Sequence, residues 1–186
     1  MPAPSIDIRR IGLAQRMLEL GVRPHLVAHA MGLPQPTLIS WYQQITGDRT
    51  KRGPLKTGAA SYVRDRSGAE RLSVFCVLYR TLQRDQTPSA EHLIAAIEMY
   101  NRLQPEPIDG TLAWMAAREL DASRESGRDD MLKLRFCTSC KLPHVYHLQS
   151  VALRKCPFCR PCAVSGKRRG RKREQVDSDS QLILPD

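Results

Sequence analysis

Two pairs of closely spaced cysteines near the C-terminus constrain this sequence more than any other feature. The pairs are Cys137 with Cys140 and Cys156 with Cys159, and fifteen residues separate them. This spacing is typical of a four-thiolate zinc site, because a Cys-x-x-Cys turn presents two thiolates to one tetrahedral Zn²⁺ ion. Four protein ligands leave no position for water. We therefore expect one structural zinc ion rather than a catalytic one.

Other ligand sets are compatible with the same stretch. Cys162 follows Cys159 at the Cys-x-x-Cys spacing, and His144 and His147 lie between the two pairs. We favour the four cysteines of the two pairs, because the pairs are symmetric and Pro157 stiffens the second turn. Disulfides and free thiols are the remaining alternatives.

The charge of the chain favours a polyanionic partner. Lys and Arg number 29 against 19 Asp and Glu, which gives a net charge of +10 and a pI near 9.7. Nucleic acid is the usual partner of so basic a protein. No apolar run reaches membrane-spanning length, and we see no signal peptide. Cysteines in metal-type spacing favour a reducing compartment, so we expect a cytoplasmic location and no membrane partner.

Glycine and proline divide the first quarter of the chain into three expected helices. The first covers residues 6–20 and ends at Gly21, the second begins at Pro24 and ends at Gly32, and the third follows Pro34. The expected inward residues of the third helix are Leu38, Ile39, Tyr42 and Ile45.

Residues 24–45 have the pattern of a helix-turn-helix. Ala28 allows a close approach of two helices, Gly32 permits the sharp turn, and Leu38 anchors the next helix on the core. Amide and hydroxyl side chains can hydrogen-bond to base edges in a major groove of double-stranded DNA. Those expected on the exposed side are Gln35, Thr37, Ser40, Gln43 and Gln44. An ordinary helical hairpin is the alternative.

Two basic segments are further candidates for DNA contact. The loop over residues 47–58 is rich in glycine and carries the cations Arg49, Lys51, Arg52 and Lys56, so it either clamps a DNA backbone or is a solvated connection. The second segment is a block of cations that either binds phosphates or keeps the chain end soluble. Its cations are Lys167, Arg168, Arg169, Arg171, Lys172 and Arg173.

Helical periodicity predicts three more helices in the middle of the chain. One lies near residues 69–84, one follows Thr87-Pro88-Ser89 with Leu103 on its apolar face, and one runs from Thr111 to Gly127. Their aromatic residues keep register with aliphatic ones, which indicates a core rather than base-stacking platforms. Cys76 lies in such an apolar run and is expected to be buried.

These elements predict a mainly α protein. We expect a helical domain over residues 1–130, a zinc-binding module over residues 131–165, and a disordered tail over residues 166–186 that is first basic and then acidic.

The combination resembles the FlhC family of bacterial transcription activators over residues 6–175. The resemblance is carried by the four paired cysteines, by the turn from Gly32-Leu33 to Thr37-Leu38, and by the step Gly53-Pro54-Leu55. It implies zinc bound by the four cysteines, a hetero-oligomer with an FlhD-like subunit, and activation of promoters through RNA polymerase. Flagellar members carry tryptophan-rich sequence where this chain has residues 61–66. Related activators of conjugative elements act on transfer genes, so the resemblance implies flagellar or conjugative-transfer promoters.

Two other classes of protein share some of these features. A zinc-ribbon enzyme such as a nuclease would need a catalytic cluster or a phosphate loop, and the sequence has neither. We therefore do not expect an enzyme. An RNA-binding or ribosome-associated zinc-ribbon protein would share the basic charge and the cysteine spacing, and it remains the alternative.

Overall fold

The computed structural model describes residues 7–47, 49, 53, 55–84, 86–126 and 131–159 of the chain. This part contains six α-helices, a two-stranded sheet and two short 3-10 turns. In chain order the elements are α1 Ile8–Glu19, α2 Pro24–Met31, α3 Gln35–Thr46, η1 Ala59–Tyr62, α4 Arg66–Gln83, α5 Ala90–Leu103, α6 Gly110–Ser126, β1 Lys133–Phe136, β2 Pro143–Tyr146 and η2 Val151–Leu153. The predicted mainly α fold is confirmed.

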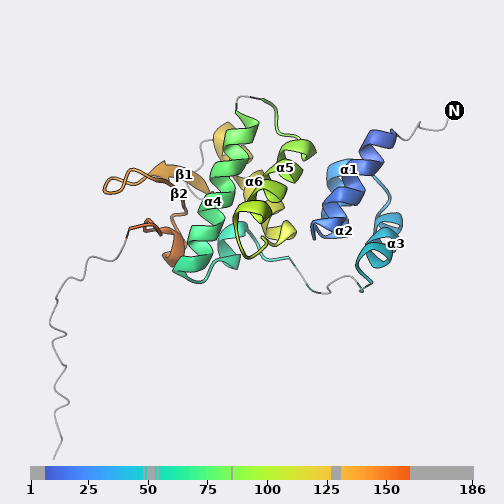
Figure 1. Ribbon diagram of the computed structural model, residues 1–186, viewed down its shortest axis with the longest axis horizontal. Coiled ribbons are helices and arrows are strands. Elements are labelled where there is room, and N and C mark those ends of the chain that lie inside the picture. Colours follow the sequence, from blue (N-terminus) through green and yellow to red (C-terminus); the bar gives the residue numbers. More distant parts are fainter. Residues whose placement is uncertain are drawn as a thin grey trace, which may run out of the picture.

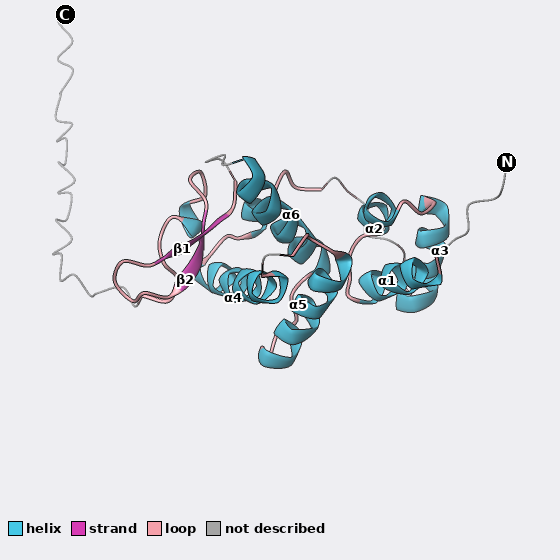
Figure 2. Ribbon diagram, turned by 90° about the horizontal axis from the view of Figure 1, so that it is seen from above, coloured by secondary structure: helices cyan, strands magenta, loops and turns pink. Residues whose placement is uncertain are grey.

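The elements form three groups that follow one another along the longest axis of the molecule. Helices α1, α2 and α3 form a group at one end, α4, α5 and α6 lie in the middle, and the sheet lies at the other end (Figure 1). The view from above gives the same order (Figure 2). The predicted boundary at residue 130 falls within residues 127–130, outside the described residues.

The three N-terminal helices form as the sequence predicts. The Asp7 side chain caps α1 by accepting a hydrogen bond from the Arg9 N–H, and Pro24 occupies the first turn of α2. Gly32 ends α2 with φ of 58°, a left-handed conformation, and its N–H donates to the Ala28 carbonyl. The chain can therefore turn within three residues and begin α3, whose Leu38 is fully buried.

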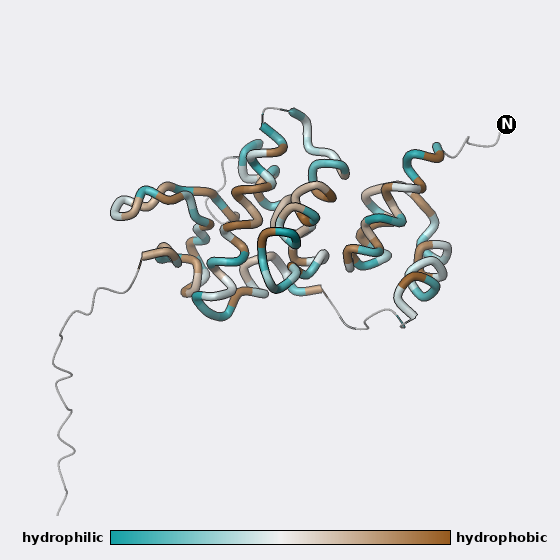
Figure 3. Tube along the Cα trace, in the orientation of Figure 1, coloured by the Kyte–Doolittle hydropathy of each residue, from teal (hydrophilic) through white to brown (hydrophobic). Residues whose placement is uncertain are grey.

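The core extends through all six helices and reaches Val145 of the hairpin, and apolar residues recur along the helices (Figure 3). The Phe75 ring lies 6.3 Å from the Tyr79 ring in a stacked arrangement and 6.5 Å from the Tyr100 ring in an edge-on arrangement. All three rings are buried, so the prediction that these aromatics form the core is confirmed. Cys76 is also buried, and its burial raises the pKa of the thiol.

The N-terminal helices pack on the middle helices at a close backbone contact. Gly110, the first residue of α6, lies against the turn after α1, where a Cβ atom would overlap the Leu20 carbonyl oxygen. Next to it, the Thr111 hydroxyl donates to the Gly21 carbonyl at 3.2 Å and accepts from the Arg23 N–H at 3.3 Å. This glycine and threonine therefore join the two groups of helices directly.

The sheet is a hairpin that packs on α4. Strands β1 and β2 are antiparallel, with Leu134 opposite Val145 and Phe136 opposite Pro143. The Val145 N–H donates to the Ser73 hydroxyl of α4 at 3.1 Å, and that hydroxyl donates to the Ala69 carbonyl. Both Ser73 and Val145 are fully buried, so this bond fixes the hairpin against the helix.

Three details differ from the predictions. Ile45 was expected inside but is 40% exposed, and Leu103 was expected on a buried face but is 63% exposed. Both lie in the last turn of their helices. Helix α4 begins at Arg66 rather than near residue 69, because the Asp65 side chain caps it by accepting from the Gly68 N–H. In the part of the chain that the structure describes, no helix is both long and apolar enough to cross a membrane.

Candidate functional site

The four cysteines of the two pairs meet at the outer end of the hairpin. The sulfur atoms of Cys137, Cys140, Cys156 and Cys159 all lie within 4.8 Å of one another. The Cys137 and Cys159 sulfurs are 3.5 Å apart, and those of Cys140 and Cys156 are 3.6 Å apart. A tetrahedron of Zn–S bonds of about 2.3 Å has edges of about 3.8 Å. The cluster therefore has the size that a tetrahedral metal site requires, and it can hold a metal ion.

The first pair lies in the turn of the hairpin. The Cys137 N–H donates to the Leu142 carbonyl at 3.0 Å, and the Lys141 N–H donates to the Cys137 carbonyl at 3.0 Å. Lys141 has φ of 60°, which closes the turn tightly. The backbone N–H groups of Cys140 and Ser139 donate to the Cys137 sulfur and lower the pKa of its thiol. These two N–H groups therefore favour the thiolate form of Cys137, which is the form that binds a metal.

The second pair is held by an arginine from a distant part of the chain. Arg66, the first residue of α4, donates from Nε to the Pro157 carbonyl and from Nη2 to the Cys159 carbonyl, each at 2.7 Å. Sequence reasoning missed this residue. No local pattern marks it, because residues 66 and 157 are 91 positions apart and Arg66 is one of many arginines.

The alternative ligands do not join the cluster in the described residues. His144 lies in β2, is 6% exposed, and its Nδ1 has no hydrogen-bond partner within the described residues. The Nδ1 of His147 accepts a hydrogen bond from the Gln149 N–H at 3.3 Å. Among the residues that the structure describes, the metal-sized group consists of the four cysteines. Cys162 lies outside the described residues.

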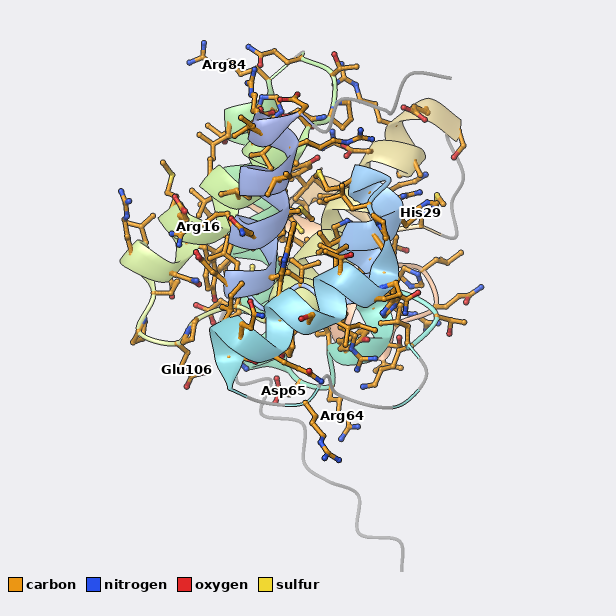
Figure 4. All side chains as sticks on the ribbon, turned by 90° about the vertical axis from the view of Figure 1, so that its right-hand side faces the viewer. Arg16, His29, Arg64, Asp65, Arg84 and Glu106 are labelled. Carbon is orange, nitrogen blue, oxygen red and sulfur yellow. The ribbon has the colours of Figure 1, made fainter. Side chains whose placement is uncertain are left out.

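Helix α3 presents the polar face that the sequence predicts. It lies on the outer side of the N-terminal group, in front of α1 and α2 in Figure 4. Its buried side is formed by Leu38, with Trp41 and Tyr42 half-buried against the core. The exposed residues include Gln35, Thr37, Ser40, Gln43 and Gln44. The structure therefore leaves these five side chains accessible to a partner.

The remaining candidates for DNA contact lie mostly beyond what the structure describes. Arg49 is exposed. Lys51 and Arg52 of the loop lie outside the described residues, as do the six tail cations Lys167, Arg168, Arg169, Arg171, Lys172 and Arg173.

The fold and the site define a mostly helical protein with a C-terminal four-cysteine cluster that can bind a metal ion. Residues 5–172 match the sequence model of a family described as "Flagellar transcriptional activator (FlhC)". The match covers most of the chain, so the protein belongs to the FlhC family of transcriptional regulators, and the resemblance predicted from the sequence is confirmed.

Two relatives carry the name "Flagellar transcriptional regulator FlhC". The protein of Variovorax paradoxus (strain S110) is 28% identical over 174 residues, covering 90% of this chain and 82% of the relative. The protein of Paraburkholderia phymatum (strain DSM 17167 / CIP 108236 / LMG 21445 / STM815) is 27% identical over 190 residues, covering 96% of this chain and 81% of the relative. Both names describe regulators of transcription rather than enzymes.

Proposed function

We infer that this protein is a DNA-binding subunit of a transcription activator and that α3 reads bases in the major groove of double-stranded DNA. The observation that supports this most is the division of α3 into two faces. Leu38 holds one face in the core, whereas the amide and hydroxyl side chains of Gln35, Thr37 and Gln44 are exposed on the surface. Such side chains can form bidentate or single hydrogen bonds to base edges.

Zinc is the metal that we propose for the cysteine cluster. Four thiolates at tetrahedral spacing suit Zn²⁺, and a closed set of four protein ligands supports structure rather than catalysis. Bound zinc would hold the turn of the hairpin against the second pair. Binding of the metal should therefore be coupled to folding of residues 131–159.

An FlhD-like subunit and RNA polymerase are the proposed protein partners, and this part of the proposal rests on membership of the FlhC family. Exposed apolar side chains agree with a partner that covers them, since Met99 and Leu103 lie exposed on α5. The promoters would be flagellar, as the names of the relatives suggest, or those of conjugative transfer genes. The expected location is the bacterial cytoplasm.

A comparison of nucleic-acid substrates tests the proposal. Full-length protein, alone and with the FlhD-like protein of the same genome, would be titrated with promoter duplexes chosen from a genome-wide binding map. Random duplexes and single-stranded RNA of equal length serve as competitors. We expect tighter binding to the promoter duplex than to either competitor. Preference for single-stranded RNA would contradict the proposal and favour an RNA-binding zinc-ribbon protein.

A further inference from the structure

The cysteine module carries cations without any acidic side chain. Residues 131–159 contain no Asp or Glu, although 19 of the 186 residues in the chain are acidic. The cations of this stretch are Lys133, Arg135, Lys141, Arg154 and Lys155. We propose that this basic surface of the module binds the phosphate backbone of duplex DNA and is a second contact site, separate from α3. The proposal deepens the function inferred above and depends on it.

The charge of the metal site alone does not account for these cations. A zinc ion with four thiolates has a net charge of −2, whereas the five cations together carry a charge of +5. Four of the five are exposed to solvent, namely Arg135, Lys141, Arg154 and Lys155. In the part of the chain that the structure describes, none of these four forms an ion pair with a carboxylate. Their positive charge is therefore available to an external anion.

Two of the arginines are already held in place. The Arg135 guanidinium lies over the Tyr146 ring, 3.9 Å from its centroid. Arg154 donates from Nε to the Leu148 carbonyl at 2.8 Å. Such contacts restrict the side chains before a ligand arrives, so fewer rotamers are lost when the guanidinium binds a phosphate.

Apolar side chains lie exposed next to these cations. Phe136 follows Arg135 at the end of β1 and is 77% exposed, and Leu142 follows Lys141 in the hairpin turn and is also exposed. A partner for this surface must place anionic groups beside apolar surface. Duplex DNA does so, because phosphates flank the sugars and base edges of each groove.

The module lies at the opposite end of the molecule from α3 (Figure 1). Contacts made by its cations would therefore be additional to those of α3. In sequence, the block of six cations at residues 167–173 begins eight residues after Cys159.

Salt dependence measures the proposed contact directly. The test uses full-length zinc-loaded protein and random-sequence duplex DNA, and compares wild type with the double variant Lys141→Gln/Lys155→Gln. Because each phosphate contact contributes about −0.9 to the log–log salt slope, we expect the slope of the double variant to be shallower by about 2. Lys141→Arg/Lys155→Arg should keep the wild-type slope. Arg102→Gln, which removes an exposed cation from α5, is the matched control and should also keep it.

A second variant separates the apolar contact from the charges. Phe136→Ala should weaken binding several-fold without changing the salt slope, since it removes no cation. An unchanged slope for the double variant with full zinc content would overturn the inference and leave the proposed function standing. Loss of binding to a protein partner alone would also overturn it, because the surface would then be a protein-docking site. Failure of the wild-type protein to bind duplex DNA, both alone and with the FlhD-like protein, would instead refute the proposed function.

Discussion

The guanidinium of Arg66 connects the start of α4 to the carbonyl oxygen of Pro157, between the two cysteines of the second pair, at 2.7 Å. A second bond of the same length reaches the Cys159 carbonyl. The planar guanidinium thus fixes two carbonyl groups of one turn at once. It also brings a positive charge close to a site that would be dianionic with zinc bound. The position of the second pair therefore depends on the helical part of the molecule.

Replacing Arg66 should loosen the metal site. We expect Arg66→Ala to weaken zinc affinity about tenfold, the lower end of the range for lost outer-shell contacts, and therefore to release zinc faster. Arg66→Lys should be intermediate, because a single ammonium cannot reproduce the two-pronged bond. Zinc release to a chromogenic chelator and the visible spectrum of the cobalt-substituted protein are the measurements. Arg64→Ala is the control, since Arg64 extends away from the ribbon in Figure 4. Equal release rates for the Arg66→Ala variant and the wild-type protein would disprove this role.

Serine substitutions identify the fourth ligand of the metal. Cys159→Ser should lower zinc content and solubility, because metal binding and folding are coupled in such modules. Cys162→Ser should retain a full equivalent of zinc, because the cluster is complete without it. Metal analysis of the purified proteins decides between the two cysteines. The reverse result, with zinc lost only from the Cys162 variant, would make our ligand assignment wrong.

Single substitutions on α3 test base reading. Thr37→Ala or Gln44→Ala should weaken binding to the promoter duplex by about 1–3 kcal/mol and leave binding to random duplex nearly unchanged. Gln15→Ala on the exposed side of α1 is a matched control that should change neither. Fluorescence anisotropy on both duplexes gives the two affinities. Equal losses of affinity for the promoter duplex and the random duplex would mean that these residues contact phosphates or support the fold.

Truncation after Gly166 should flatten the salt dependence of DNA binding. The six removed cations would contribute roughly −5 to the log–log slope if all of them contacted phosphates, at about −0.9 each. We expect about half of this change and similar losses on promoter and random duplex, because phosphate contacts carry no base information. Titrations of the full-length and truncated proteins with both duplexes over a salt series measure the change in slope. A loss confined to the promoter duplex would instead indicate that the tail reads sequence or shape.

Glu119 should make stability depend on pH. Burial raises the pKa of its carboxyl group, although the Ala59 N–H donates to it at 2.6 Å. The protonated form is therefore favoured in the folded state. The contribution of the protonated Glu119 carboxyl group to the free energy of unfolding is complete below the ordinary pKa of glutamate. This contribution is lost as pH rises through the pKa of the folded state. Glu119→Gln should remove this dependence, so the variant gains stability relative to wild type as pH rises. Denaturant unfolding of both proteins at matched pH values measures the difference between their free energies of unfolding. A difference that stays constant with pH would refute this prediction.

Local patterns in the sequence predicted much of the fold and of the site. The positions of Gly32 and Pro34 predicted the turn before α3, and the spacing of the cysteines predicted the cluster, because these signals act over a few residues. The contacts of Arg66 and Ser73 with the cysteine module join residues more than seventy positions apart, and no periodicity marks them. Helical periodicity also identified apolar faces without showing where neighbouring elements end, which is why Leu103 was wrongly placed inside.

Helix α3 and the cysteine module lie far apart along the long axis of the molecule (Figure 1). If both contact one DNA duplex, this separation restricts the number of base pairs between the two contacts. A duplex returns the same groove to the same side only once per turn, about every 10.5 base pairs. Two contact sites held by one protein chain can both meet grooves that face the protein only if the DNA between them has a suitable number of base pairs. Half a turn of additional sequence between the two contacts would place the second on the far side of the duplex. A full turn would restore its orientation at a greater separation. Promoters that use both ends of this molecule should therefore differ in length between these contacts by whole turns, if they differ at all.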